Sequence, residues 1–251
     1  MTRRRFYAPP TGFAADEKSV TLSAEETRHA RDVLRLQAGE EVSVFNGTGR
    51  EFLCTVQSIS RNSTTLSVVA EVGPARPESP LDLTLAIALL KGEKFDLVIQ
   101  KTIELGVKRI VPLDTERADV RFRDGHSSEN RLARWRRIAL EAAKQTGRAY
   151  VPEISEPVAC TNLLTSSRSS ARLMFSEREG TSLSAAALGF GEHPSAMIAL
   201  VGPEGGWSDN EIETARAGGW GIVTLGGRIL RAETAGIAVV TLLQHRFGDL
   251  V

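Results

Sequence analysis

Alternating apolar and polar positions predict short β-strands in the first 72 residues of the chain. The alternation marks four segments: 19–22, 41–45, 52–56 and 64–69. A helix interrupts these strands, because Ser23 can cap its first turn and Glu26 can complete a capping box. The apolar face of this helix is formed by Ala30, Val33 and Leu34. We therefore expect a small barrel-like module over residues 1–72.

Residues 73–80 contain three prolines and one glycine, a composition typical of a linker. Beyond them the apolar pattern alternates between strands and helices. Strands are expected at 81–90, 109–113, 173–175, 197–201 and 222–225, and helices near 95–105, from Ser128, from Ser208, and from Ala232 to Arg246. This alternation predicts a mostly parallel α/β sheet over 81–251, which would bind ligands at the carboxyl ends of its strands.

Composition is that of a folded soluble protein, with 251 residues of which 41% are hydrophobic. No apolar run approaches the roughly 20 residues of a membrane span, and no apolar core follows the N-terminal arginines as in a secretory signal. Cys54 and Cys160 are far apart, which argues against a disulfide framework or a zinc site. We expect a cytoplasmic location.

The formal charge is zero, with 31 basic and 31 acidic side chains, but its distribution is uneven. Residues 76–150 carry 15 basic and 11 acidic groups, whereas residues 151–251 carry 7 and 11. The basic excess is concentrated in 117–148. It could bind nucleic-acid phosphates or simply form a solvated helix face, and charge alone does not separate the two.

Two glycine-rich segments follow predicted strands near the C-terminus. In 199–208 a strand leads into three glycines and then a helix, which Ser208 and Glu211 can cap. The spacing fits neither the dinucleotide fingerprint nor a phosphate-binding P-loop, so this segment is a ligand loop or only a tight turn. In 224–235 two glycines precede Arg228, Arg231 and Glu233. Glu233 can interact favourably with the dipole of the helix that follows, or it can pair with Arg231. Both loops should meet at one edge of the sheet.

Other candidate groups are less specific. Lys94, Lys101 and Glu104 could form a polar stripe on one helix, and Arg148 could satisfy a helix C-terminus after Gly147. The four histidines form no metal-like cluster, and no serine nucleophile motif is present, so we expect no metal site. The three tryptophans are more typical of packing; Trp207, beside a glycine loop, is the one to test for nucleobase contact.

Six motifs taken together resemble one family. They are residues 4–7, His29 with 33–36, 100–107, 145–148, 202–206 and 225–235. On these motifs, which cover nearly the whole chain, the protein resembles the RsmE-type methyltransferases of the SPOUT class. That family methylates N3 of a uridine in 16S ribosomal RNA. The departures are Trp207, where the family often has Phe, and Ala232, where Thr is common.

The resemblance implies an N-terminal PUA-like barrel, a C-terminal SPOUT α/β domain with a deep trefoil knot, and a homodimer. It also implies S-adenosylmethionine as cofactor, bound in the knot. The cofactor residues implied by the match are Phe175, Ser176, Leu200, Val201, Gly202, Glu204, Gly205, Gly206, Leu225, Gly226, Ile229, Leu230, Arg231, Thr234 and Ala235.

The substrate would be 16S rRNA, expected within the assembled 30S subunit. Arg231 is the candidate for stabilising charge on the uracil, and Glu204 or Glu233 could accept the N3 proton or hold Arg231. Candidate RNA contacts are Arg4, Arg5, Arg35, Lys91, Lys94, Lys101, Arg121, Arg123 and Arg148. Two alternatives remain: a non-catalytic RNA-binding protein of ribosome assembly, without cofactor affinity, and a nucleotide-using metabolic enzyme, which would lack a phosphate motif.

Overall fold

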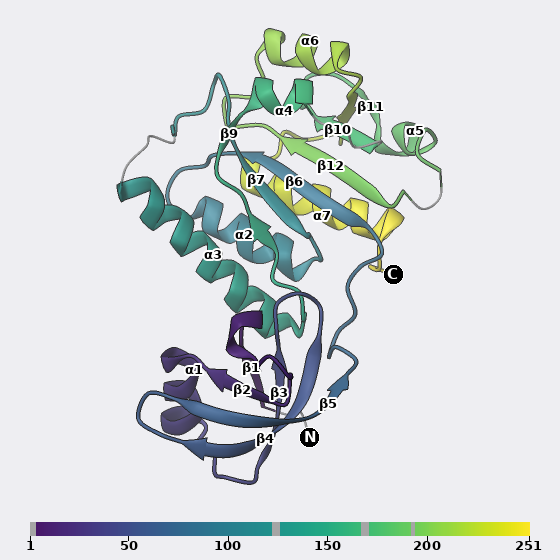
Figure 1. Cartoon of the computed structure of the whole chain (residues 1–251). Helices are drawn as coiled ribbons and strands as arrows, with labels where there is room; N and C mark the ends of the chain where they lie inside the picture. The colour runs from purple at the N-terminus through teal and green to yellow at the C-terminus, as the bar shows by residue number, and fades with distance from the viewer. Residues whose placement is uncertain (1–3, 122–125, 167–170, 192–193) are drawn as a thin grey trace. The chain divides into compact units, whose positions relative to one another are not determined.

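The computed structural model describes residues 4–121, 126–166, 171–191 and 194–251 (Figure 1). The chain divides into two compact units. One contains residues 1–78 together with 143–151, and the other contains residues 79–142 together with 152–251. The segment 143–151 is distant in sequence from the rest of the first unit, and hydrophobic periodicity gave no sign of this association.

A five-stranded sheet forms the first unit, in the order β1-β3-β4-β5-β2. Its strands are β1 (Arg5–Tyr7), β2 (Ser19–Leu22), β3 (Glu41–Phe45), β4 (Glu51–Ile59) and β5 (Thr64–Val72), with η1 (Pro10–Gly12) before β2. β1 runs parallel to β3, and the other neighbours are antiparallel. Phe6, Val44, Cys54 and Leu66 are fully buried in its core. The four predicted strands are confirmed, whereas β1 was too short to be recognised.

The predicted helix of this unit is only partly correct. Ser23 caps α1 (Ala24–Arg28) by accepting a hydrogen bond from the Glu26 amide, but the Glu26 carboxylate accepts from Lys144 Nζ at 2.7 Å instead of completing the capping box. α1 continues into a π-helical turn, η2 (His29–Val33). This wider turn rotates the following residues, so Ala30 is buried while Val33 is 66% exposed rather than part of the apolar face.

Buried ion pairs hold the later segments of the first unit to its sheet. The Glu51 carboxylate accepts hydrogen bonds from Arg5 at 3.1 Å and from the Ala75 amide at 3.1 Å. Arg5 also donates to the Arg148 carbonyl at 2.8 Å, and Arg148, which is 5% exposed, pairs with Glu78 at 2.6 Å. Residues 75–78 and 148 are therefore bonded to the first unit.

A parallel sheet forms the second unit, in the order β11-β13-β10-β12-β6-β7-β8, with β9 also beside β7. The strands are β6 (Asp82–Ala88), β7 (Arg109–Asp114), β8 (Glu153–Ile154), β9 (Val158–Ala159), β10 (Ala171–Phe175), β11 (Thr181–Ser182), β12 (Ala196–Val201) and β13 (Gly221–Thr224). Every pair in it is parallel, which confirms the predicted α/β sheet.

Helices cover both faces of this sheet (Figure 1). They are α2 (Lys94–Glu104), α3 (His126–Thr146), α4 (Cys160–Ser166), α5 (Leu183–Ala187), α6 (Asp209–Ala217) and α7 (Ala232–Phe247). Leu85 and Ile87 of β6 pack with α2, α3 and α7, while Ala86 between them packs in the cluster that includes α4 and α6. This alternation of side chains makes three layers, because successive residues of a strand point to opposite faces. In the described part of the chain, no helix is long and apolar enough to cross a membrane.

We predict that Glu51→Ala destabilises the first unit strongly. The substitution leaves the buried Arg5 guanidinium without its carboxylate, a change that costs about 3 kcal/mol or more. Glu71→Ala is the control, because Glu71 of the same sheet pairs with Arg50 at an exposed site, where solvent screens the ion pair and its loss should change stability little. Urea unfolding followed by circular dichroism measures both; equal free-energy losses would contradict the prediction.

Candidate functional site

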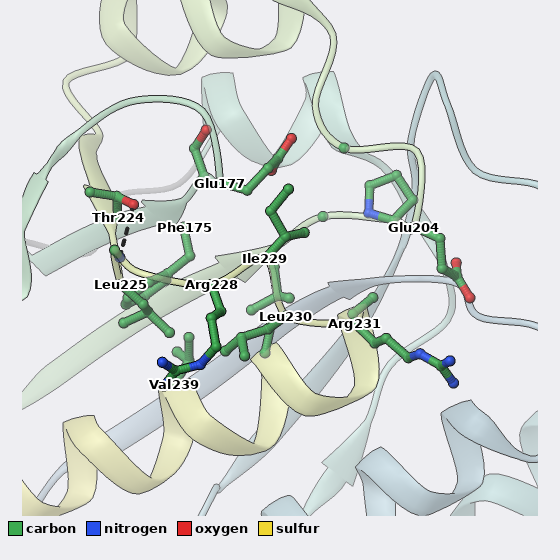
Figure 2. A pocket seen from close by; sticks show the side chains of 18 of the residues that line it. Phe175, Glu177, Glu204, Thr224, Leu225, Arg228, Ile229, Leu230, Arg231 and Val239 are labelled. Atoms are coloured by element: carbon green, nitrogen blue, oxygen red, sulfur yellow. Dashed lines mark hydrogen bonds between the residues drawn. The ribbon is translucent and has the colours of Figure 1, made fainter.

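A cavity of about 480 Å³ opens at the carboxyl ends of three neighbouring strands (Figure 2). Phe175 ends β10, Val201 ends β12 and Thr224 ends β13, and all three residues line the cavity. Because these strands are adjacent and parallel, the segments that follow them meet at one edge of the sheet. The two glycine-rich loops converge there, as the sequence predicted.

The residues predicted to contact a cofactor line this cavity, with two exceptions. Leu200 points to the opposite face of the sheet, where it is buried in the cluster with α4 and α6. Thr234 is exposed on α7 and does not line the cavity. The cavity also involves residues that were not predicted: Glu177, Pro203, Thr224, Gly227, Arg228, Ala232 and Val239. Their position in the sequence could have identified most of them, since they lie within the two glycine-rich loops or directly after β10.

The cavity walls are largely apolar. Figure 2 shows Leu225, Ile229 and Leu230 from the loop before α7, with Val239 on α7 itself. Ile229 lines the cavity and is 83% exposed, so its apolar side chain is accessible to a ligand. An apolar wall with a few polar groups is typical of a small-molecule site.

Backbone conformation explains the paired glycines of the second loop. Gly226 and Gly227 both have φ of +68°, which side-chain-bearing residues rarely adopt, and a Cβ atom at either position would meet no atom within 4 Å. The loop therefore requires glycine for its backbone turn rather than for space. The Gly226 amide donates a hydrogen bond to Thr224 Oγ1 at 3.1 Å, which fixes the turn at the end of β13.

Trp207 holds the first glycine loop against the sheet. It is fully buried, and its Nε1 donates to the Phe175 carbonyl at 2.7 Å. Its own carbonyl accepts hydrogen bonds from Arg117 and Arg178. Trp207 is therefore a packing residue and offers no face to a nucleobase. A Cβ atom on Gly202 would come within 3.0 Å of its ring, so glycine at 202 allows this packing.

The predicted capping box of α6 is confirmed. Ser208 Oγ accepts from the Glu211 amide, and the Glu211 carboxylate accepts from the Ser208 amide at 2.9 Å. The same carboxylate also accepts from the Glu116 amide at 2.9 Å. Glu211 therefore connects the loop after β7 to the start of α6, beside the first glycine loop.

Four charged groups from three elements lie near the mouth of the cavity. Lys94, the first residue of α2, donates from Nζ to Glu204 Oε1 at 3.0 Å and lies 3.7 Å from Glu233 Oε2. The hydrogen bond to Glu204 raises the pKa of the Lys94 ammonium above its ordinary value, so the group remains charged across the neutral range. Arg231 is close enough to oppose this shift electrostatically. Figure 2 shows Glu204 and Arg231 at the same end of the cavity.

Arg231 carries no ion pair within the described part of the chain, although it lies two residues before Glu233. Of the two alternatives left open for Glu233, the structure does not contain the pair with Arg231: Glu233 faces Lys94 from the first turn of α7. The reason is geometric, because Arg231 is the extended N-cap residue of α7 and Glu233 lies in the first turn of that helix. The guanidinium of Arg231 remains available to a ligand.

Several candidate RNA contacts form ion pairs on the surface. Lys91 pairs with Asp119 at 2.7 Å. Lys101 pairs with Glu104 at 2.9 Å, so two of the three members of the predicted polar stripe form an ion pair with each other. The exposed side chain of Arg4 pairs with Glu40 at 3.1 Å. Arg121 pairs with Asp114 and donates to two carbonyls of the same loop.

The remaining candidates have different surroundings. Arg5 and Arg148 are buried in the ion pairs of the first unit, a placement that does not favour direct contact with RNA. Arg35 is exposed and has a φ of +51°, uncommon for a residue with a side chain. Arg123 lies outside the described residues.

Neither cysteine takes part in the site. Cys54 and Cys160 are free and buried, and burial raises the pKa of each thiol to about 12. Among the described residues no group of histidine, cysteine, aspartate and glutamate side chains could hold a metal ion.

Comparison with protein families gives two matches that together span most of the chain. Residues 77–244 match a model described as an RNA methyltransferase domain, and residues 22–69 match a model described as an RNA methyltransferase PUA domain. A Synechocystis protein named ribosomal RNA small subunit methyltransferase E is 35% identical over 221 residues, covering 87% of this chain and 70% of that protein. The Bacillus subtilis protein of the same name is 29% identical over 90% of each chain.

Solved structures agree with these matches. Ribosomal RNA small subunit methyltransferase E from Neisseria gonorrhoeae, bound to S-adenosylmethionine, is similar over 100% of both chains, with a TM-score of 0.86 and 32% identity. A Legionella pneumophila methyltransferase in complex with the same cofactor is also similar over 100% of both chains, with a TM-score of 0.87 and 31% identity. The chain therefore belongs to the RsmE family of RNA methyltransferases.

Proposed function

We propose that this protein transfers a methyl group from S-adenosylmethionine to N3 of a uridine in 16S rRNA. The observation that carries this proposal is the cavity at the carboxyl ends of β10, β12 and β13. It is built from the same loops whose motifs resemble the family, and Arg231 and Glu204 stand at one end of it.

The cavity fits the cofactor in size and chemistry. Its volume of about 480 Å³ lies within the range of small-molecule sites. Val201, Leu225, Leu230 and Val239 supply apolar surface for a base, and the glycine loops leave backbone amides and carbonyls accessible for polar contacts. When bound, S-adenosylmethionine supplies the methyl group and is converted into a neutral thioether.

The residues at the mouth of the cavity suit proton removal from a uracil. The target base must be unstacked or already unpaired to reach a site this enclosed. The guanidinium of Arg231, which has no ion pair among the described residues, can then stabilise the negative charge that develops on the uracil ring. Glu204, a carboxylate at the same end of the cavity, is the proposed acceptor of the N3 proton. Alignment of N3 with the methyl group would supply much of the remaining rate.

The family membership also supports several finer proposals. The first unit acts as a PUA-like RNA-binding module, with the domain boundary in 73–80 and the methyltransferase domain over 81–251, apart from the segment 143–151 that belongs to the first unit. Arg4 and Arg35, which are exposed there, are its proposed RNA contacts. In the second unit the proposed contacts are Lys91, Lys101 and Arg121. The loops around the cavity form a deep trefoil knot, the protein is a homodimer, and it methylates the assembled 30S subunit in the cytoplasm.

Cofactor binding should depend on the glycine turn after β13. Gly226→Ala places a Cβ atom at a φ of +68°, and the resulting strain of about 1–2 kcal/mol should displace the loop and weaken S-adenosylmethionine binding about tenfold. Gly39→Ala is a matched control, because Gly39 also has a positive φ and open space but lies in the first unit. Isothermal titration calorimetry measures both affinities. Equal affinities in the two variants would contradict this role of the loop.

Methyl transfer should depend on Arg231. Arg231→Ala removes a cavity-lining guanidinium that forms no ion pair with the described residues, and it should lower the rate more than about 100-fold while the fold stays intact. The substrate is the 30S subunit from a methylation-deficient strain, with labelled methyl donor and analysis of the modified nucleosides. Near-normal transfer by Arg231→Ala at saturating substrate would show that this assignment is wrong. Methylation by the unsubstituted protein at a position other than uridine N3 would overturn the proposed substrate.

A further inference from the structure

Lys94, Glu204 and Glu233 form a chain of charges that runs from the protein interior to the cavity. Glu233 Oε2 lies 3.7 Å from Lys94 Nζ, and the same Nζ lies 3.0 Å from Glu204 Oε1. The three residues come from α7, from the first turn of α2, and from the first glycine loop. These elements are far apart in the sequence and meet only in the folded protein, so no sequence pattern indicates that the three side chains are connected.

Burial gives this chain a direction. The Glu233 side chain is 13% exposed, and its Oε2 is a buried oxygen without a hydrogen bond. The Lys94 side chain is 37% exposed and that of Glu204 is 29% exposed. Glu204 lines the cavity, whereas Glu233 does not. Of the two carboxylates, only Glu204 can therefore touch a substrate without rearrangement.

Lys94 also leaves part of Glu204 free. The ammonium bonds to Oε1, and within the described residues Oε2 of Glu204 has no hydrogen-bond partner. Lys94 lies between two carboxylates, so moving its ammonium away from Glu204 breaks a charge-assisted hydrogen bond, and moving it away from Glu233 breaks an ion pair. The arrangement holds one oxygen of the Glu204 carboxylate, at the edge of the cavity, while the other keeps its capacity to accept a hydrogen bond or a proton.

We propose that Lys94 is a positioning residue that holds Glu204 for proton abstraction from the substrate, and that buried Glu233 acts only by orienting Lys94. This inference rests on the proposed function and assigns roles within the same site. The N3–H bond of the uracil would break and its proton would pass to Glu204 Oε2. The electron pair left on N3 would form the bond to the methyl carbon while the carbon–sulfur bond of the donor breaks, with its electron pair going to the sulfur. Glu204 later releases the proton to water.

This role differs from direct RNA contact, the other role available to an exposed lysine. A phosphate contact would contribute to RNA affinity and to its salt dependence. A positioning role predicts instead that the chemical step slows while RNA affinity is kept. The two roles are therefore separated by measuring affinity and single-turnover rate on the same variants.

The test uses the full-length protein and 30S subunits that lack the methyl group. Lys94→Met should lower the single-turnover rate at saturating substrate by about 100-fold, because the carboxylate loses its position. The affinities for 30S subunits and for S-adenosylmethionine should stay unchanged, and Lys94→Arg should restore most of the rate. Arg109→Met is the control for loss of a partly exposed ion pair, because Arg109 pairs with Glu153 at the start of β7, at the edge of the sheet away from the cavity. It should leave the single-turnover rate unchanged.

A double-mutant cycle then shows whether Lys94 acts through Glu204. Glu204→Gln should slow the reaction by about 100-fold or more, and adding Lys94→Met to it should have no further effect. Glu233→Gln should slow the single-turnover rate in the parent protein but not in Lys94→Met. Multiplicative effects of Lys94→Met and Glu204→Gln, or weaker 30S binding by Lys94→Met with an unchanged rate, would overturn the inference. Failure of the parent protein to methylate uridine would instead refute the proposed function.

Discussion

The parallel sheet of the second unit is the constraint on which the site depends. In such a sheet every strand ends at the same edge, so the loops after β10, β12 and β13 meet although 50 residues separate Phe175 from Leu225. Each loop contributes a different surface to the cavity. The loop after β12 supplies glycines and Glu204, and the loop after β13 supplies a glycine turn, apolar side chains and Arg231. Neither loop encloses a ligand by itself.

Rigid support behind the loops fixes their shape. Trp207 bonds the first glycine loop to the end of β10, and the Glu211 carboxylate bonds the start of α6 to the loop after β7. At the charged end of the cavity, α2 brings Lys94 to Glu204 and Glu233. Charges held in place by such contacts need little rearrangement during a reaction. We therefore propose separate roles for the two parts of the cavity, ligand binding for the apolar wall and proton removal for the charged end.

Sequence patterns predicted the elements that are long or strongly marked. The parallel α/β sheet, the glycine loops and the capping box at Ser208 follow from periodicity and turn chemistry, and the structure contains them. Short elements such as β1 and β8 carry too few residues for a period to appear. The π-helical turn that exposes Val33 has no clear sequence signal. Ion pairs between residues far apart in the sequence could not be predicted from it. Arg231, two residues before Glu233, was one possible partner of that carboxylate, whereas the group that faces Glu233 is Lys94 from another helix.

A high-resolution structure of the protein with S-adenosylmethionine would show directly whether the cavity is the methyl-transfer site. We expect the cofactor to occupy the cavity between the loops after β10, β12 and β13. Leu225, Ile229 and Leu230 should contact it, and Lys94 should still bond Glu204 beside the methyl group. Cofactor bound elsewhere on the chain, or bound in this cavity with its methyl group directed away from Glu204 and Arg231, would contradict the account.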